Sequence, residues 1–443
     1  MPFARRMAPP IRTLREFAEA TVGSAVAVGG WVEDVRNLGS IGFVLVRLRD
    51  ATVQVTAKKK ADEALFQALT RLTRESVVMV TGTLVENKEA RQGREVLPTA
   101  LEVLSAAETP LPLGVVDKVS ADFATRLDNR TIDLRKPAVR AAFQVRSVLQ
   151  RAIRREMDRH GFVEVHTPKI AGAGAEGGAT LFETDYFGKR AFLSQSPQLY
   201  KQMLMATGLD RVYEVAPAFR AEPSDTVRHV TEFVSFDAEI AWIEHQEDFL
   251  RILEGVLAAS IAAVREEAKP WLETLGVDPK VPALPLPRVP YSEALQVLKE
   301  RGKVVRDGED LDTEAEKVLG RAMAEQGHEL FYITEYPSEI KPFYVMSKPD
   351  EPEYSYSFDL EFKGDEMASG GQREHRFGEL VGKMTAKGLN PAKFEFYLSP
   401  FRYGMPPHGG WGLGLDRLAQ KLLDLPNIRE AILFPRDRTR LVP

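Results

Sequence analysis

Residues 25–104 contain five β-rich runs that decide the fold of this part of the chain: AVAVGGWV (25–32), GFVLVRL (42–48), ATVQVTA (51–57), SVVMVTGTLV (76–85) and EVLPTALEVL (95–104). Valine, threonine and aromatic residues dominate these runs, and glycine and charged residues separate them, which is typical of strands joined by turns. One helix-like stretch, residues 62–73, lies between the third and fourth runs. Five strands with a helix at that point predict an OB-fold barrel, with another small β-barrel as the alternative.

The rest of the chain mixes helices and strands. Residues 138–160 predict a long helix, because Val145, Leu149, Ile153 and Met157 recur on one face, and Gly161 stands where a helix-ending glycine is expected. Further helices are predicted at 247–267 and 311–326. Strands are predicted at GFVEVHTP (161–168), AFLSQSP (191–197), RVYEVAPAFRAE (211–222), EFVSFDAEIAWI (232–243), LFYITEYP (330–337), PFYVM (342–346), YSFDLEF (356–362) and KFEFYL (393–398). Many strands with few crossover helices favour an antiparallel sheet and an α+β fold.

The length of the chain predicts more than one domain. Its 443 residues exceed the size of one ordinary core, which holds about 100 to 200 residues. The segment ETPLPLGVVDKVSADFATRLDNR (108–130) has the prolines and charges of a hinge and little periodicity. We therefore expect an OB-fold domain over residues 1–109, a hinge over 110–132 and an α+β domain over 133–443.

The composition excludes several classes of protein. The chain has no cysteine, which rules out thiol catalysis, disulfides and cysteine-bound metal. Its net charge of −5 argues against nucleic-acid binding by bulk electrostatics, so any such contact must be local. The longest apolar run, near residues 256–264, is far shorter than a membrane span, and no signal-type apolar segment follows the start MPFARRMAPP. A cytoplasmic location is expected.

Three separate segments concentrate arginine, glycine and acidic residues: PAFRAEPSDTVRHVTEFVSFDAE (217–239), SFDLEFKGDEMASGGQREHR (357–376) and PPHGGWGLGLDRLAQ (406–420). Guanidinium groups suit the oxygens of a polyphosphate, and carboxylates beside them can hold magnesium. For Arg220, Arg228, Arg373 or Arg417 taken singly, an ordinary surface ion pair is the simpler interpretation. The occurrence of all four in such segments favours a nucleotide site.

The order of three motifs carries a family resemblance. The helix at 138–160 with GFVEVHTP resembles motif 1, FRAE (219–222) with RH (228–229) and EF (232–233) resembles motif 2, and GLGLDR (412–417) resembles motif 3. Behind an OB-like module, these motifs resemble class II aminoacyl-tRNA synthetases over nearly the whole chain, and among them aspartyl-tRNA synthetases of the compact archaeal-like type. The resemblance implies a class II catalytic domain built on an antiparallel sheet flanked by helices, an anticodon-binding domain, and a homodimer formed through motif 1. The implied reaction is the ATP-dependent ligation of L-aspartate to tRNA(Asp) through an aspartyl-adenylate.

The resemblance also implies an ATP site with Mg²⁺. Arg220 and Arg417 would be catalytic, with Arg220 on the α-phosphate and the attacked carboxylate and Arg417 on the γ-phosphate of a bent ATP. Phe233 would stack on adenine, Glu222 would read its amino group, and His229 would approach the γ-phosphate. The implied ATP-binding set is Arg220, Glu222, Arg228, His229, Phe233, Glu366 and Arg417, with Glu366 and Ser369 as the magnesium ligands.

The string SQSPQLYK (194–201) matches the family's amino-acid-binding segment. Lys201 and Arg373 would meet on the side-chain carboxylate of aspartate, and asparagine would leave these buried cations unpaired. Asparaginyl enzymes of the subgroup lack this lysine, although an ion-paired surface lysine is the simpler interpretation of Lys201 by itself. The implied aspartate-binding set is Glu176, Ser196, Gln198, Lys201, Arg220, Asp237, Ser369 and Arg373, in which Glu176, Gln198 and Asp237 would hold the α-ammonium.

In the OB-like domain, Phe43, Gln54 and Glu95 match the positions at which this family stacks on and reads the anticodon. Members strict for tRNA(Asp) have tryptophan and lysine where this chain has Glu33 and Arg91. This departure leads to the hypothesis that tRNA(Asn) is also charged with aspartate, and that a separate amidotransferase converts the product. The alternatives are an asparaginyl-tRNA synthetase, a non-catalytic tRNA-binding paralogue, and an amide ligase on the same catalytic fold, which would lack the anticodon module.

Overall fold

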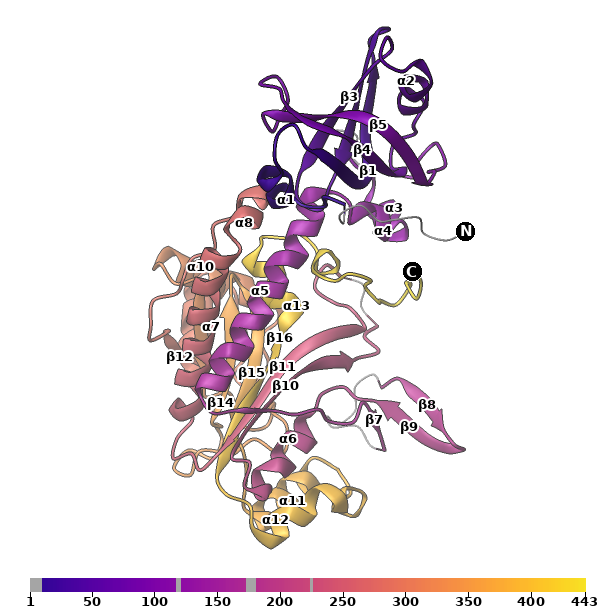
Figure 1. Cartoon of the computed structure of the whole chain (residues 1–443). Coiled ribbons are helices and arrows are strands. Elements are labelled where there is room, and N and C mark those ends of the chain that lie inside the picture. The colour runs from indigo at the N-terminus through magenta and orange to yellow at the C-terminus, as the bar shows by residue number, and fades with distance from the viewer. Residues whose placement is uncertain (1–9, 117–120, 173–180, 224–225) are drawn as a thin grey trace. The chain divides into compact units, whose positions relative to one another are not determined.

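The computed structural model describes residues 10–116, 121–172, 181–223 and 226–443. The chain divides into two compact units, Met1–Thr125 (unit 1) and Arg126–Pro443 (unit 2). In Figure 1, unit 1 runs from indigo to purple and unit 2 from purple to yellow. The hinge expected over residues 110–132 stays a prediction.

Unit 1 is a closed five-stranded barrel with the strand order β1-β2-β3-β5-β4. Its strands are β1 (Ala25–Asn37), β2 (Ile41–Arg47), β3 (Thr52–Lys58), β4 (Val77–Glu86) and β5 (Arg94–Ser105), and its helices are α1 (Leu14–Glu19) and α2 (Glu63–Thr70). Alternate valines fill the interior, as the period of a strand requires, and Val28, Val44 and Val80 are fully buried. The side chain of Asp62 starts α2 by accepting a hydrogen bond from the backbone N–H of Leu65 at 2.9 Å. The predicted OB-fold is confirmed.

Unit 2 is built on an eight-stranded sheet with the order β12-β13-β14-β15-β16-β11-β10-β6. Its strands are β6 (Val163–Glu164), β10 (Arg211–Phe219), β11 (Glu232–Ala241), β12 (Arg288–Pro290), β13 (Leu330–Thr334), β14 (Ser357–Phe362), β15 (Asp365–Gln372) and β16 (His408–Gly414). Neighbouring strands are antiparallel except for the pairs β6–β10 and β12–β13, which are parallel. The sheet is therefore mixed, and antiparallel pairing dominates it as predicted.

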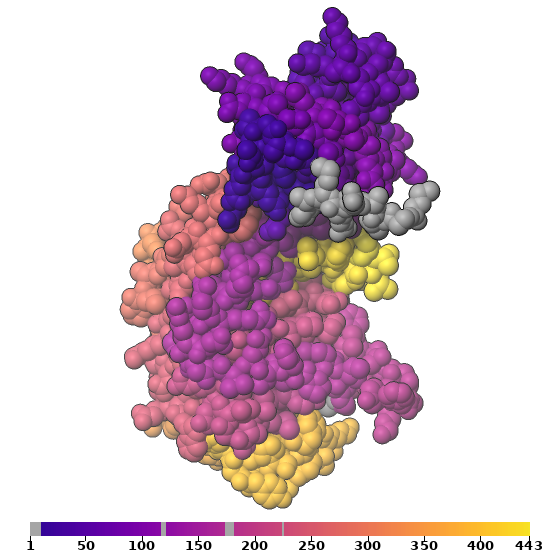
Figure 2. Space-filling view, viewed as in Figure 1, coloured from indigo at the N-terminus to yellow at the C-terminus, as the bar shows by residue number. Residues whose placement is uncertain are grey.

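A second, three-stranded sheet in unit 2 has the order β7-β9-β8. Its strands are β7 (Ile170–Ala171), β8 (Glu183–Tyr186) and β9 (Lys189–Leu193). Figure 2 shows the β8–β9 hairpin standing out from the rest of the unit. At its tip Phe187 is 89% exposed, so this hairpin contributes little to the core.

The long helices of unit 2 lie along the large sheet (Figure 1). The helices from residue 123 onward are α3 (Phe123–Asp128), α4 (Arg130–Asp133), α5 (Pro137–Arg159), α6 (Gln198–Leu204), η1 (Met205–Thr207), α7 (Glu247–Glu267), α8 (Lys269–Leu275), α9 (Tyr291–Glu300), α10 (Thr313–Glu325), α11 (Phe377–Ala386), η2 (Pro391–Phe394), α12 (Glu395–Gly404), α13 (Leu415–Leu422) and η3 (Ile428–Ala431). In the part of the chain that the structure describes, none of the helices combines the length and apolarity needed to cross a bilayer.

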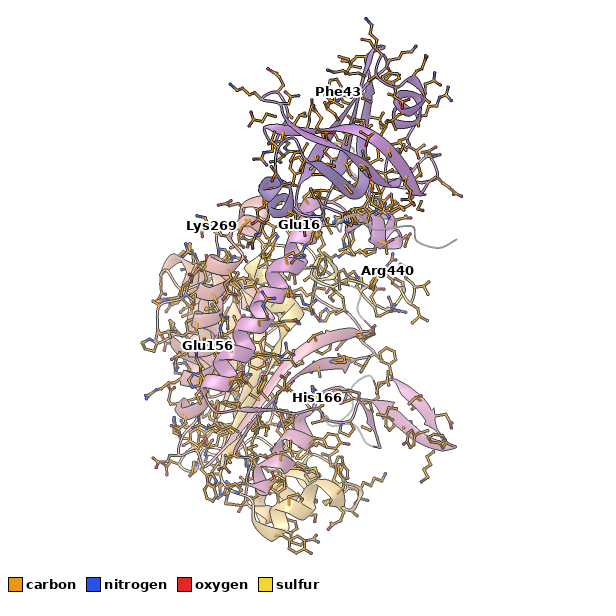
Figure 3. All side chains as sticks on the ribbon, viewed as in Figure 1. Glu16, Phe43, Glu156, His166, Lys269 and Arg440 are labelled. Carbon is orange, nitrogen blue, oxygen red and sulfur yellow. The ribbon has the colours of Figure 1, made fainter. Side chains whose placement is uncertain are left out.

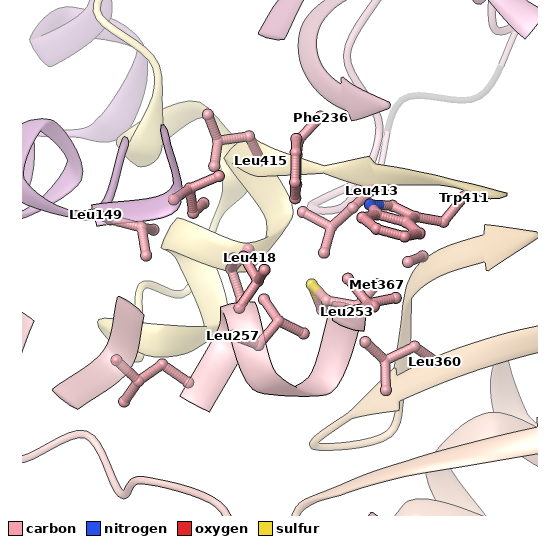
Figure 4. Close-up of a cluster of buried hydrophobic side chains, with 14 of the residues drawn as sticks. Leu149, Phe236, Leu253, Leu257, Leu360, Met367, Trp411, Leu413, Leu415 and Leu418 are labelled. Carbon is pink, nitrogen blue, oxygen red and sulfur yellow. The ribbon is translucent and has the colours of Figure 1, made fainter. Parts of the chain in front are cut away.

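The main core lies between the sheet and the helices α5, α7 and α13. Figure 4 shows Trp411 and Leu413 of β16 packed against Leu253 and Leu257 of α7 and Leu418 of α13. The predicted helix at 138–160 is α5, and its four predicted core residues are all buried. Gly161 follows α5 with φ +74°, a conformation that glycine adopts without strain.

Two predicted strands are wrong. The run KFEFYL (393–398) forms η2 and the start of α12, because Asn390 caps η2 and the aromatic residues also recur at helical spacing, which buries Tyr397 and Phe401. The run PFYVM (342–346) forms a turn with a single bridge, from Val345 to Arg373. GFVEVHTP retains only the two-residue strand β6.

Glycines let β16 approach β11 closely. A Cβ atom at Gly410 would lie 2.1 Å from the carbonyl oxygen of Ala238 and 2.5 Å from Oε2 of Glu239, and one at Gly412 would lie 3.0 Å from Oδ1 of Asp237. Real Cβ atoms do not approach other atoms to 2.1 Å. The glycine-rich sequence of β16 therefore creates the space in which two carboxylates of β11 lie.

We predict that Gly410→Ala lowers the free energy of unfolding by about 1 to 3 kcal/mol, the usual cost of forcing extra atoms into a packed site. Gly382→Ala is the matched control, because a Cβ at this position in α11 meets nothing within 4 Å and alanine favours a helix. Scanning calorimetry of both variants tests this. An unchanged melting temperature for Gly410→Ala would contradict the packing described here.

Candidate active site

A cavity of about 360 Å³ in unit 2 gathers the three segments that are rich in arginine and glycine. The strand order explains why they meet, since β10 and β11 lie beside β16 and β15, which come more than 120 residues later in the sequence (Figure 1). Asp237, Gly412 and Ser369 form one row across three strands. The predicted residues that line the cavity are Ser196, Gln198, Arg220, Glu222, Arg228, His229, Phe233, Asp237, Glu366, Ser369, Arg373 and Arg417.

Arg220 and Phe233 stand together where β10 ends. Strand register pairs Phe233 with Ala218, and the backbone N–H of Arg220 donates to the carbonyl of Thr231 at 2.9 Å. The Arg220 guanidinium carbon lies 5.4 Å from the centre of the Phe233 ring, within the range of a cation–π contact. The Arg417 side chain donates to the backbone carbonyl of Glu366. Two guanidinium groups and one aromatic ring therefore line the cavity.

Arg228 has acidic partners that the sequence did not reveal. Its Nη1 donates to Oε2 of Glu316 at 3.0 Å and also contacts Oδ1 of Asp365, and its Nη2 contacts the hydroxyl of Thr313. Glu316 lies in α10 and Asp365 in β15, so only the fold brings them to Arg228.

His229 is held by Thr226, whose hydroxyl lies 2.6 Å from Nδ1 of the ring. Burial, with Arg417 nearby, lowers the pKa of His229 below its ordinary value. The ring is therefore neutral at pH 7, and it can offer one N–H donor to an anion in the cavity.

Carboxylates of β14 and β15 also line the cavity. Glu366 pairs in register with Glu361, and Ser369 pairs with Asp359. Burial raises the pKa of Asp359 to about 6, even though Lys341 donates to it at 2.8 Å, and burial also raises the pKa of Glu361. Among the described residues, Asp359 Oδ1 and Glu361 Oε2 are buried without a hydrogen-bond partner.

These carboxylates fit a magnesium ion that is bound together with phosphates. Buried carboxylate oxygens without partners are suitable ligands for a hard cation, and Mg²⁺ is commonly held by one or two carboxylates plus substrate phosphates and water. Within the described ranges, no three histidine, aspartate or glutamate side chains already form a metal-binding group. Asp359 and Glu361 were not chosen as ligands from the sequence, although their alternation in YSFDLEF places them on one face of β14.

A group of four buried charges borders the cavity, which two of its members, Asp237 and Arg373, line. Lys201 Nζ donates to Oδ1 of Asp237 at 3.0 Å and to the carbonyl of Trp411 at 2.7 Å, and it lies 3.6 Å from Oε2 of Glu239. Arg373 Nε donates to Oε1 of Glu239 at 2.9 Å. Although burial alone would raise it, Arg373 and Lys201 hold the pKa of Glu239 below its ordinary value. Glu239 is thus a central residue of this group that the sequence analysis missed.

The local sequence explains how α6 delivers Lys201. The Ser196 hydroxyl accepts from the backbone N–H of Gln198 at 3.1 Å, where α6 begins, and Lys201 follows one turn later, facing β11. Gln198 accepts a hydrogen bond from Arg373 at 3.5 Å. Asp237, Gln198 and Arg373 line the cavity, whereas Lys201 contacts Asp237 but is not among the lining residues. Glu176 lies outside the described residues.

In unit 1, the residues predicted to bind the anticodon share one face of the barrel. Gln54 Nε2 donates to Oε2 of Glu95 at 2.8 Å across adjacent strands, and the hydroxyl of Thr56 donates to the same oxygen at 2.5 Å. Phe43, labelled in Figure 3, pairs in register with Thr56.

The two residues predicted to set tRNA discrimination differ in their surroundings. Glu33 lies at a bulge of β1, where its carboxylate accepts from the hydroxyl of Thr52 at 3.1 Å. Arg91 is exposed between β4 and β5.

Comparisons with known proteins agree with this architecture. Residues 122–438 match the model of the tRNA synthetases class II (D, K and N), and residues 26–104 match the OB-fold nucleic acid binding domain. The aspartate–tRNA(Asp) ligase of Pyrococcus horikoshii is 51% identical over 430 residues, which cover 97% of this chain and 98% of that protein. The aspartate–tRNA(Asp/Asn) ligase of Methanothermobacter thermautotrophicus is 48% identical, with 95% of each chain covered.

Solved structures are similar over the whole chain as well. The crystal structure of asparaginyl-tRNA synthetase from Pyrococcus horikoshii with asparaginyl-adenylate has a TM-score of 0.90 at 33% identity and covers 99% of this chain and 100% of that one. A barrel of OB-fold topology, a catalytic sheet carrying motifs 1 to 3 in order, and family matches over both units lead to one conclusion: the chain belongs to the class II tRNA synthetases of the D, K and N group.

Proposed function

We propose that this protein is an aspartate–tRNA ligase that activates L-aspartate with ATP and transfers it to tRNA(Asp). The observation that carries the proposal is the group of four buried charges formed by Lys201, Asp237, Glu239 and Arg373, two positive and two negative. The relatives named aspartate–tRNA ligases, at about half identity over nearly the full chain, support the same reaction.

The charge balance of this group favours aspartate over asparagine. If Asp237 takes the α-ammonium of the amino acid, the two cations are left with Glu239 alone, and one positive charge lacks a partner. The side-chain carboxylate of aspartate supplies that partner, whereas the amide of asparagine does not, and an unpaired buried charge is costly. A site of this kind can discriminate by about 10⁴-fold.

The first step is displacement at the α-phosphorus of ATP. An oxygen of the α-carboxylate of aspartate forms the new bond to the α-phosphorus. The bond from the α-phosphorus to the oxygen that bridges it to the β-phosphorus breaks, and pyrophosphate leaves. Arg220 neutralises the approaching anions, Arg417 and His229 hold the far end of the triphosphate, and Phe233 stacks on adenine. Glu366 and Ser369, which pair in register with Glu361 and Asp359, would hold Mg²⁺, and a bound ion would supply further neutralisation of the phosphate charge. No proton moves in this step, so none of these residues needs to act as a base.

In the second step, a ribose hydroxyl of the terminal adenosine attacks the mixed anhydride and AMP leaves. We propose a homodimer for the working enzyme, because β6 of motif 1 ends the large sheet and exposes Val163 at 44%. The exposed end of the sheet offers a surface on which a second copy can pack.

We further propose that tRNA(Asn) is also charged with aspartate and that an amidotransferase then converts the product. Glu33 and Arg91 replace the tryptophan and lysine found in strict members of the family. The Glu33 carboxylate bonds Thr52 of β3, two residues from Gln54 on the same strand, so it adds negative charge to the face that would read the anticodon. Relatives of both specificities are similar to this chain to nearly the same degree.

Lys201→Leu is expected to reduce aspartate-dependent ATP–pyrophosphate exchange by at least about 10³-fold, because it removes a cation from the buried group. ATP binding, measured by calorimetry, should persist. Lys363→Leu is the control, since Lys363 donates to Asp424 and is not among the residues that line the cavity. Exchange kinetics like those of the wild type in Lys201→Leu would show that the specificity assignment is wrong.

Aminoacylation of tRNA(Asp) and tRNA(Asn) transcripts with aspartate is expected to give product with both. The double variant Glu33→Trp, Arg91→Lys should lower the rate with tRNA(Asn) by about tenfold or more, the effect of one recognition contact, and leave tRNA(Asp) charging within about twofold. An absence of aspartyl-tRNA(Asn) from the wild-type reaction would end the proposal of relaxed specificity.

A further inference from the structure

Arg228 has two acidic partners in the structure. Its Nη1 lies between Oε2 of Glu316, at 3.0 Å, and the carboxylate of Asp365, while its Nη2 contacts the Thr313 hydroxyl. The side chains of Arg228 and Glu316 are each 13% exposed, so solvent screens this pair less than a surface pair. Both side chains line the cavity.

The two acidic partners of Arg228 differ in their other contacts. Asp365 also forms an ion pair with Lys421, so it keeps a cation when Arg228 moves. Glu316 pairs with Arg228 from the first turn of α10, beside Thr313. A movement of Arg228 would therefore take away the cation that Glu316 pairs with, whereas Asp365 would keep Lys421.

The backbone around Glu316 is fixed by close packing. The Asp312 side chain caps α10 by accepting from the backbone N–H of Ala315 at 2.8 Å. One turn beyond Glu316, a Cβ at Gly320 would lie only 2.4 Å from the Cα of Gly364, so α10 touches the β14–β15 turn directly. Residues four apart lie on one face of a helix, and this contact therefore sets where the Glu316 side chain points.

From this geometry we infer that Glu316 is a positioning residue for ATP, acting through Arg228. An arginine side chain has many rotamers, and a phosphate that has to order it binds less tightly than one that meets it already in place. Glu316 and Thr313 hold two corners of the guanidinium from α10 and leave its remaining N–H groups for phosphate oxygens. The inference rests on the proposed function and on the ATP-binding role that the family resemblance implies for Arg228.

The test is a double-mutant cycle on ATP–pyrophosphate exchange. Burial raises the pKa of Glu316 to about 7, so the assay is run at pH 8, where the carboxylate is mostly ionised. Glu316→Gln then keeps the shape of the side chain and removes its charge, and it is expected to raise the KM for ATP about tenfold, the effect of weakening one hydrogen bond to a charged group. We expect kcat and the KM for aspartate to stay within about twofold of wild type. In an Arg228→Ala background, Glu316→Gln should raise the KM for ATP no further, because its effect passes through Arg228.

Glu314→Gln is the matched control, since Glu314 lies on the same helix with a side chain 76% exposed and pairs with Lys303. Thr313→Val gives a second variant that removes a neutral contact to Arg228, and it should raise the KM for ATP by a smaller factor. A KM for ATP that is unchanged or lowered by Glu316→Gln, or raised equally in both backgrounds, overturns the inference. If Arg228→Ala alone leaves this KM unchanged, the proposed role of Arg228 itself is wrong.

Discussion

The pairing of Lys201 and Arg373 with Asp237 and Glu239 is the interaction on which the site depends. Each of the four side chains is at most 5% exposed, and charges this deeply buried are tolerated only when they are paired. The arrangement requires β16 to lie against β11 without side chains in between, which Gly410 and Gly412 allow. The close approach of β16 to β11 is therefore required for the charge group that would bind the amino acid.

The same sheet brings groups of opposite charge to the cavity. Arg220 and Arg417 line it together with Asp359, Glu361 and Glu366, and the strand order brings these groups from three distant segments. A polyphosphate and a divalent cation would balance the two sets of charges together, and neither would do so alone. This complementarity is the physical reason why a carboxylate and a triphosphate, which repel each other in water, could react here.

The sequence predicted those elements whose apolar residues follow a single period, either that of a strand or that of a helix. The barrel strands alternate cleanly, and α5 repeats its apolar residues every four positions, so both were recognised. KFEFYL failed because its aromatic residues satisfy the strand and helix periods at once, and only their burial against α11 and α6 decides for the helix. A segment whose residues fit both the strand period and the helix period can be assigned only from the elements that pack against it in the fold.

The sequence motifs identified many of the residues that line the cavity. They did not identify some of the acidic residues that pair with the cationic ones. Glu239 and Glu316 have ordinary sequence neighbours, and their importance arises only when β11 meets β16 and α10 meets the β14–β15 turn. Pairing across the sheet is a property of strand order, which a single sequence does not state. The magnesium ligands, the anticodon contacts and the role of Glu176 stay predictions from the family resemblance.

The central claim is that one buried cation loses its partner when Asp237 binds the α-ammonium of the amino acid. This unpaired positive charge then selects an acidic side chain. The most direct measurement compares kcat/KM for ATP–pyrophosphate exchange by the wild-type protein with aspartate and with asparagine. The account predicts a preference for aspartate of about 10⁴-fold. Equal exchange with asparagine would contradict it, because a neutral amide would then satisfy a pocket that requires an anion.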